Sequence, residues 1–133
     1  MGAPAAKQGD LSTAVDMHIV MVPSPSGTVP TPLPHPFNGM LDGNLSSNVK
    51  IMGMAAATMG STASNNPPHF PSPPGTAFQI PPMNKATILS GSSTVLINGK
   101  PAARLGDTVQ TCADPIPNTA GVIIANSTVM IGG

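Results

Sequence analysis

The feature that most constrains the fold of this sequence is a pattern that occurs three times. In each copy a short strand-forming run ends in a turn, and small residues follow it. The clearest copy, residues 95–107, reads VLINGKPAARLGD, and its Asn-Gly pair is a strong signal for a hairpin turn because both residues tolerate positive φ. Residues 49–61, VKIMGMAAATMGS, form a second copy. The third copy is divided between the chain ends, with its strand half at 127–133 and its small-residue half at 4–10.

This repeat predicts one domain, residues 1–133, made of three units at about 4–53, 54–99 and 100–133. The last unit stops at its turn glycines, and the first opens on the motif that should follow them, so we expect a closed ring of units. No segment shows a helical apolar stripe free of Pro and Gly. The predicted fold class is therefore all-β: a small fold of three units around an approximate threefold axis, with long Pro-rich loops and little or no helix.

The composition limits what such a chain can do. Seventeen Pro, fourteen Gly and only 2% aromatic residues leave a thin core, so we expect the folded state to need additional stabilisation from a metal or a partner. The net charge is zero and no basic cluster occurs, which argues against nucleic-acid binding. A Sec-type signal peptide is absent, and a single Cys excludes an internal disulfide. We therefore expect synthesis in a reducing compartment.

The three His and the one Cys are the candidate metal ligands. His18 and His69 each lie nine residues after the repeat glycine of their units, and Cys112 lies six after its own. This placement predicts that the same loop of each unit delivers one ligand to the axis. His35 lies in a separate proline-lined loop and is the candidate fourth ligand. A closed Cys-His₃ set is one that structural zinc accepts, with one ion per chain.

Each of these residues has an ordinary alternative, since a lone His is more often exposed and a lone Cys more often a small buried apolar group. Their joint placement in the repeat favours ligation. Catalysis is the competing class, with Cys112 as a nucleophile beside a His and Asp107 or Asp114 as the orienting group. Nothing resembles a nucleophile elbow or an oxyanion loop, so the sequence predicts that the protein is not an enzyme.

The strand halves of the three units predict a docking base. Three similar strands in one chain suit the three equal edges of a trimeric partner, and pairing would cover edges that otherwise promote aggregation. One copy should therefore bind one trimer. The candidate docking residues are Val49, Ile51, Val95, Ile97, Val129 and Ile131.

The thrice-repeated motif resembles the PAAR-repeat family, the spike tips of type VI secretion systems, phage-like tails and extracellular contractile particles. Residues 4–7, 55–58 and 101–104 read PAAK, AAAT and PAAR, so the third unit keeps the motif letter for letter and the second has lost Pro and Arg. The resemblance implies a cone whose base caps a trimeric β-helical spike, VgrG-like or phage-hub-like. It also implies an apical zinc, which carries over to His18, His35, His69 and Cys112.

These implications give the expected function. The chain should carry no fused effector domain and be made in the bacterial cytoplasm. It should cap and sharpen the spike, help it to pierce a target membrane, and leave the cell at the tip of the injection particle. The membrane would be contacted only on piercing. The alternatives are a cargo or effector adaptor on the same spike, which would bind effector proteins, and a free-standing metal-binding module.

Overall fold

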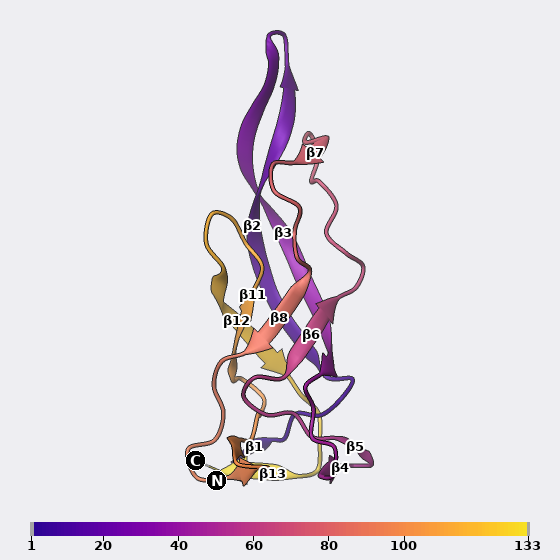
Figure 1. Ribbon diagram of the computed structural model, residues 1–133, viewed down its shortest axis with the longest axis vertical. Helices are drawn as coiled ribbons and strands as arrows, with labels where there is room; N and C mark the ends of the chain where they lie inside the picture. Colours follow the sequence, from indigo (N-terminus) through magenta and orange to yellow (C-terminus); the bar gives the residue numbers. More distant parts are fainter. Residues whose placement is uncertain (1, 133) are drawn as a thin grey trace.

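The computed structural model describes residues 2–132 as an elongated cone built from β-strands (Figure 1). Met1 and Gly133, the outer limits of the predicted domain, lie outside the described residues. The predicted all-β fold class is confirmed, since the described part of the chain contains strands and turns but no helix. Across residues 2–132 no helix is long and apolar enough to cross a membrane. Both chain ends lie at the broad base, and a long hairpin forms the narrow tip.

The middle of the cone is a closed ring of antiparallel strands. The sheet runs in the order β12-β11-β8-β6-β3-β2-β7, and β12 also pairs with β2, which closes the ring below β7. Its core contains Phe37, Leu41, Ile88, Val109 and Ile123, each no more than 2% exposed. The strands are β2 (Leu11–Ser24), β3 (Gly27–Gly43), β6 (Thr62–Asn65), β7 (Ala77–Phe78), β8 (Lys85–Ile88), β11 (Thr108–Thr111) and β12 (Asn118–Ile124).

Three short pairs of antiparallel strands form the base, and all three are called hairpins here although only two are continuous in the chain. One of them joins the two ends of the chain, because the last strand pairs with the first, so the divided copy of the repeat is completed in space. The other two turn on Met52-Gly53 and Asn98-Gly99, where all four residues have positive φ, as a type I′ turn requires. The pairs are β4 (Lys50–Ile51) with β5 (Met54–Ala55), β9 (Leu96–Ile97) with β10 (Lys100–Pro101), and β13 (Met130–Gly132) with β1 (Gly2–Pro4).

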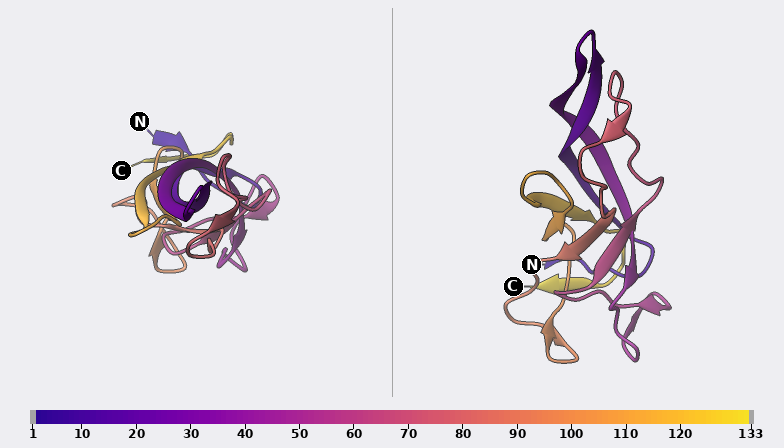
Figure 2. Two further views of the ribbon diagram at one scale, coloured as in Figure 1. Left: turned by 90° about the horizontal axis from the view of Figure 1, so that it is seen from above. Right: turned by 45° about the horizontal axis from the view of Figure 1, so that its top comes forward.

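The small-residue motifs meet in a closed cycle of backbone hydrogen bonds. The N–H of Ala6 donates to the carbonyl of Ala103 (2.9 Å), that of Ala103 to Ala57 (3.1 Å), and that of Ala57 back to Ala6 (3.0 Å). All three alanines are completely buried. Only small side chains allow three backbone segments to approach so closely, which explains the Ala pairs in the motif. The cycle relates the three units by an approximate threefold axis, and Figure 2 shows the rounded outline along the cone.

The residue that ends each motif closes its turn. The side chain of Asp10 accepts the backbone N–H of Lys7, and Asp107 accepts that of Arg104 at 2.7 Å. Both acids also form ion pairs with those basic residues. In the second unit, which lacks Asp at this position, the hydroxyl of Ser61 accepts the corresponding N–H at 3.0 Å. The altered second motif therefore keeps the same turn.

The tip departs from the sequence prediction. The proline-lined segment 30–37, predicted as a loop, is the middle of the 17-residue strand β3. Proline normally interrupts a sheet because it cannot donate a hydrogen bond. Here the prolines alternate with residues that can donate, and their own side chains are exposed. They are Pro30, Pro32, Pro34 and Pro36.

The pairing of β2 with β3 shows why the strand tolerates these prolines. In an antiparallel pair each residue directs its N–H and C=O to the same side. The carbonyls of Met17, Ile19 and Met21 accept bonds on the outer edge of β2, so the intervening residues of β2 bond to β3. Their partners are odd-numbered residues, as in the pair His18 and Leu33. Every proline therefore has its missing N–H on the free edge of β3, where no ladder bond is lost.

Candidate metal centre

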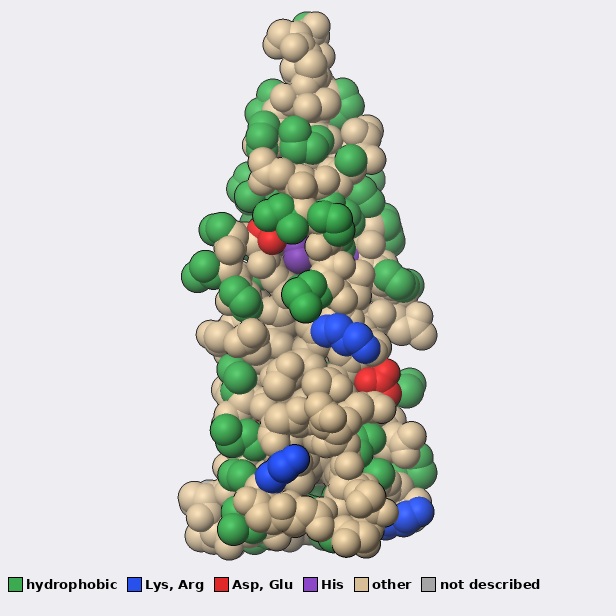
Figure 3. Space-filling view, in the orientation of Figure 1, with side chains coloured by type: hydrophobic (Ala, Val, Ile, Leu, Met, Phe, Trp, Pro, Cys, Tyr) green, Lys and Arg blue, Asp and Glu red, His purple; other side chains and the backbone are tan. Residues whose placement is uncertain are grey.

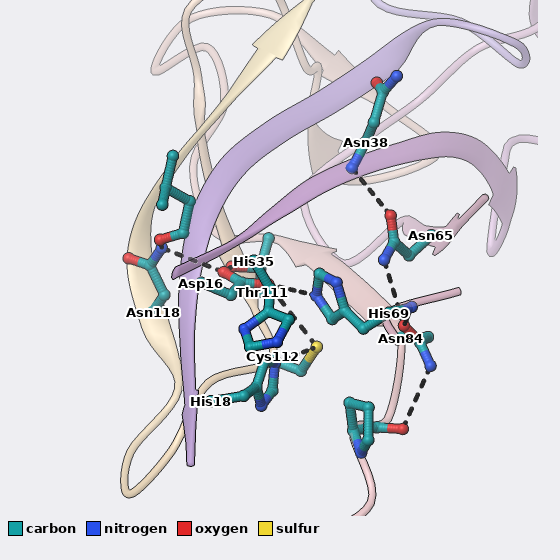
Figure 4. A network of polar contacts seen from close by, with 12 residues as sticks. Asp16, His18, His35, Asn38, Asn65, His69, Asn84, Thr111, Cys112 and Asn118 are labelled. Carbon is teal, nitrogen blue, oxygen red and sulfur yellow. Dashed lines mark hydrogen bonds and ion pairs between the residues drawn. The ribbon is translucent and has the colours of Figure 1, made fainter. Parts of the chain in front are cut away.

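The candidate metal centre lies where the tip hairpin leaves the closed ring (Figure 4). It gathers all four predicted ligands together with one residue that was not predicted. The predicted loop positions of two of them are wrong, since His18 lies within β2 and not in the loop shared by the units, and His35 lies within β3 and not in a separate proline-lined loop. His69 lies in the coil after β6, and Cys112 directly follows β11. The fifth residue is Asp16, two positions before His18.

Strand alternation explains why these side chains point inward. Along β2, Asp16 and His18 are buried, whereas Val15 and Met17 between and beside them are exposed. Asp16 is directly opposite His35 on β3, so the two side chains project to the same face of the pair. The long hairpin thus supplies three of the five polar groups from one face.

Four groups place their ligand atoms within 4.8 Å of one another. The Nε2 atom of His18 is 3.5 Å from the sulfur of Cys112. The Oδ2 atom of Asp16 is 3.7 Å from that sulfur and 3.2 Å from Nε2 of His69. A tetrahedral zinc ion with bonds of about 2.0–2.3 Å needs ligand atoms about 3.3–3.6 Å apart. The group could therefore hold a metal ion with little rearrangement.

A carboxylate outside the cluster orients His18. The Nδ1 atom of His18 is 3.1 Å from the Asp114 carboxylate, and the Asp114 backbone N–H donates to the carbonyl of Met17 at 2.8 Å. A hydrogen bond from Nδ1–H leaves the lone pair on Nε2, which faces Cys112. Carboxylate–histidine pairs of this kind fix the tautomer and the ring orientation of metal ligands. Sequence analysis considered Asp114 only as a catalytic orienting group.

Asp16 was missed by the sequence analysis. It is fully buried, and its Oδ1 atom accepts hydrogen bonds from the hydroxyl of Thr111 and from Nδ2 of Asn118, the latter at 3.2 Å. Its signal in the sequence was its spacing from His18, because residues two apart share one face of a strand. That signal could be read only once the segment was known to be a strand.

His35 lies against the centre, with its ring centroid 5.4 Å from that of His18 and 5.6 Å from that of His69. Both of its ring nitrogens have backbone partners. Nδ1 lies 2.9 Å from the carbonyl of Leu33, to which it donates, and Nε2 accepts the N–H of Ser72 at 3.1 Å. Burial lowers the pKa of His35, although the bond to Leu33 opposes this shift, so the ring favours its neutral form.

His69 behaves differently because acidic partners face it. Burial disfavours its charged form, but hydrogen bonds to Asp16 and Cys112 outweigh burial and raise the pKa of His69 to about 9. Without a metal, an ion pair between His69 and Asp16 holds the cluster together. A metal ion that binds the imidazole must displace its proton. A pocket of about 280 Å³ beside the cluster is lined by His35 and His69 among others.

The predicted docking residues all lie at the base, but they do not all face outward. Ile51, Ile97 and Ile131 are no more than 8% exposed and pack with the motif alanines in a small core, against which Val49 and Val95 also pack. Val129 is 42% exposed. The outward side chains are those immediately before the isoleucines: Lys50, Leu96 and Met130.

The base of the cone thus presents three equivalent hairpins, and a cluster of His, Cys and Asp side chains lies where the tip begins. The family model described as PAAR motif matches residues 20–109 and again 80–133, so together the matches span residues 20–133. The chain belongs to the PAAR-motif family, whose members are structural spike tips of contractile injection systems and sit on spike proteins. No curated protein matches the chain significantly.

Proposed function

We propose that this protein caps and sharpens a trimeric β-helical spike, VgrG-like or phage-hub-like, with one copy per trimer. The observation that carries the proposal is the closed hydrogen-bond cycle of Ala6, Ala57 and Ala103, which arranges three hairpins around one axis in a single chain. A true trimer presents three equal edges, and these hairpins can contact all three at once. No second copy of the chain is then needed.

The outward residues of the base suit this contact. Leu96 is 61% exposed and Met130 is 57% exposed, at equivalent positions in two of the units. Apolar side chains this exposed at a blunt end favour burial against a partner, at about 25 cal/mol per Å² of apolar surface removed from water. The first unit presents Lys50 at this position, whose aliphatic stem can lie along the contact while its amine stays in water.

The uncharged tip suits entry into a target membrane. From Met17 to Leu41 the chain contains no Asp, Glu, Lys or Arg. On the face shown in Figure 3 the acidic and basic side chains lie on the middle and lower parts of the cone. A charge that leaves water for lipid without a partner is costly, so a tip without charges lowers the resistance to piercing. This role requires assembly at the front of the particle and delivery outside the cell.

A structural zinc is part of the proposal, and the donor chemistry supports it. One thiolate and two imidazoles, from Cys112, His18 and His69, favour zinc over calcium or magnesium, which prefer oxygen ligands. Family resemblance adds His35 to this set. When bound, the ion would supply folding energy, on the order of 10 kcal/mol for structural sites of this kind. The surrounding residues position the ligands and exclude most of the water.

The test is to mix the purified protein with a trimeric spike protein from the same source, and to measure the mass of the complex by light scattering and its zinc content separately. We expect one chain per trimer. Leu96→Asp should weaken binding at least tenfold, because it buries an unpaired charge in the contact, and it should leave the zinc content unchanged. Met83→Asp is the matched control, because Met83 is 77% exposed and lies outside the base strands.

Two outcomes would contradict the proposal. Three chains per trimer would show that the hairpins do not act as three parts of one docking surface. Failure of the unmodified protein to bind any trimeric spike would favour a free-standing metal-binding module.

A cargo adaptor is the second candidate, and the exposed Phe70 beside the apolar pocket favours it, since an effector segment could cover that ring. A Phe70→Ser variant that binds the spike but loses effector capture would support this role.

A further inference from the structure

We propose that Asp16, and not His35, is the fourth metal ligand, so that the centre is a Cys-His₂-Asp site. This inference rests on the metal centre of the proposed function and departs from the Cys-His₃ set that the family resemblance implies. It assigns two roles in this chain: Asp16 binds the ion, and His35 holds the neighbouring coil in place.

The surroundings of Asp16 are those of a ligand that binds through one oxygen. Its Oδ1 atom is held by Thr111 and Asn118, while its Oδ2 atom points at the sulfur of Cys112 and at Nε2 of His69 (Figure 4). Metal-binding carboxylates are themselves hydrogen-bonded in this way, because the second oxygen must be satisfied and the first must be aimed. The separations of 3.7 and 3.2 Å from Oδ2 lie just outside the range of about 3.3–3.6 Å between neighbouring ligands of a tetrahedral ion, so only small shifts are needed.

Hydrogen-bond accounting also favours Asp16. The groups that face Oδ2 in the structure are His69 and Cys112. Both give up the proton on the facing atom when they bind a metal, so neither can then donate to Oδ2. Unless the metal takes it, Oδ2 becomes a fully buried carboxylate oxygen beside a thiolate. A buried charge in that position is strongly unfavourable, and coordination of Asp16 removes the problem.

His35, in contrast, is engaged elsewhere. Its Nδ1 atom donates to Leu33 within its own strand, and its Nε2 atom accepts the N–H of Ser72. The hydroxyl of Ser72 donates to the carbonyl of Pro34 as well, at 3.1 Å, so the two bonds hold the coil after β6 against β3. Ligation by His35 would leave the N–H of Ser72 without its acceptor, which is unfavourable for a donor that is shielded from water.

The first test uses the unmodified, zinc-loaded protein. X-ray absorption at the zinc edge counts imidazole ligands, because the rings scatter from their outer atoms as well. We expect one sulfur, two imidazoles and one oxygen. One sulfur with three imidazoles would overturn the inference about Asp16 and leave the proposed function intact. A protein that binds no zinc would overturn this inference and the zinc part of the proposed function together, while its binding to the spike would still be measured separately.

The second test compares two variants of matched size and no charge, Asp16→Asn and His35→Gln. Zinc affinity is measured against a chelator, and the cobalt-substituted proteins are compared by their visible absorption. Asp16→Asn should lower affinity by more than about 100-fold, beyond the 10–100-fold typical of an outer-shell partner, and should change the cobalt spectrum. His35→Gln should keep the spectrum and lose less than about tenfold in affinity. The reverse ranking would refute the assignment.

Discussion

Substitution of Ala57 by Val tests the close approach of the three units at the axis. Ala57 is completely buried and its N–H and C=O both belong to the cycle with Ala6 and Ala103. Two added methyl groups have no space unless the backbone segments move apart, which lengthens the hydrogen bonds of the cycle. Overpacking of a tight core costs about 1–3 kcal/mol.

The expected shift in melting temperature follows from the size of the chain. With about 2.1 cal/mol/K per residue, the unfolding entropy of 133 residues is about 0.28 kcal/mol/K, so Ala57→Val should lower Tm by about 4–11 °C. The assay is calorimetry of the zinc-saturated protein. Ala77→Val is the control, because Ala77 is exposed on a strand, and it should change stability by less than about 0.5 kcal/mol. An Ala57→Val protein as stable as the control would refute the close-packed axis.

Two further variants probe the metal centre. Cys112→Ser should lower zinc occupancy and Tm together, because it removes the thiolate ligand. Metal analysis and calorimetry measure the two quantities. A variant that is zinc-free yet as stable as the unmodified protein would contradict a structural role for the ion. Asp114→Asn should lower zinc affinity by about 10–100-fold without loss of stoichiometry, because the amide orients His18 less well, and chelator competition measures it. Unchanged affinity in Asp114→Asn would show that the bond to His18 does not position the ligand.

The repeat made the base of this protein predictable. Strand-forming runs followed by Asn98-Gly99 or its equivalents predicted the hairpins, and the divided third copy predicted that the chain ends would meet. The phase of the strands was not predictable. Ile97 and Leu96 are both apolar, and period-two alternation does not say which of them faces the core until the axis is known. For this reason the docking prediction named Ile97, whereas Leu96 is the outward residue.

The tip and the metal centre show a second limit. Proline usually interrupts a strand, so residues 30–37 of β3 were predicted as a loop. Prolines at alternate positions nevertheless leave the hydrogen-bond ladder to β2 intact. The same error concealed Asp16, whose inward direction depends on β2 being a strand. The His and Cys residues were found because their types are rare in this chain, and a single Asp carries no such signal.

The free edge of β3 has a consequence for what the tip can adhere to. A strand that approaches a sheet from the side joins it by donating and accepting along the edge in turn. From Pro30 to Pro36 this edge offers carbonyl oxygens but no N–H, so the carbonyls of an incoming strand would meet proline rings and lose their bonds with water. This edge of the tip therefore disfavours extension by another protein's strand, and at Pro34 the coil after β6 already contacts it through the hydroxyl of Ser72.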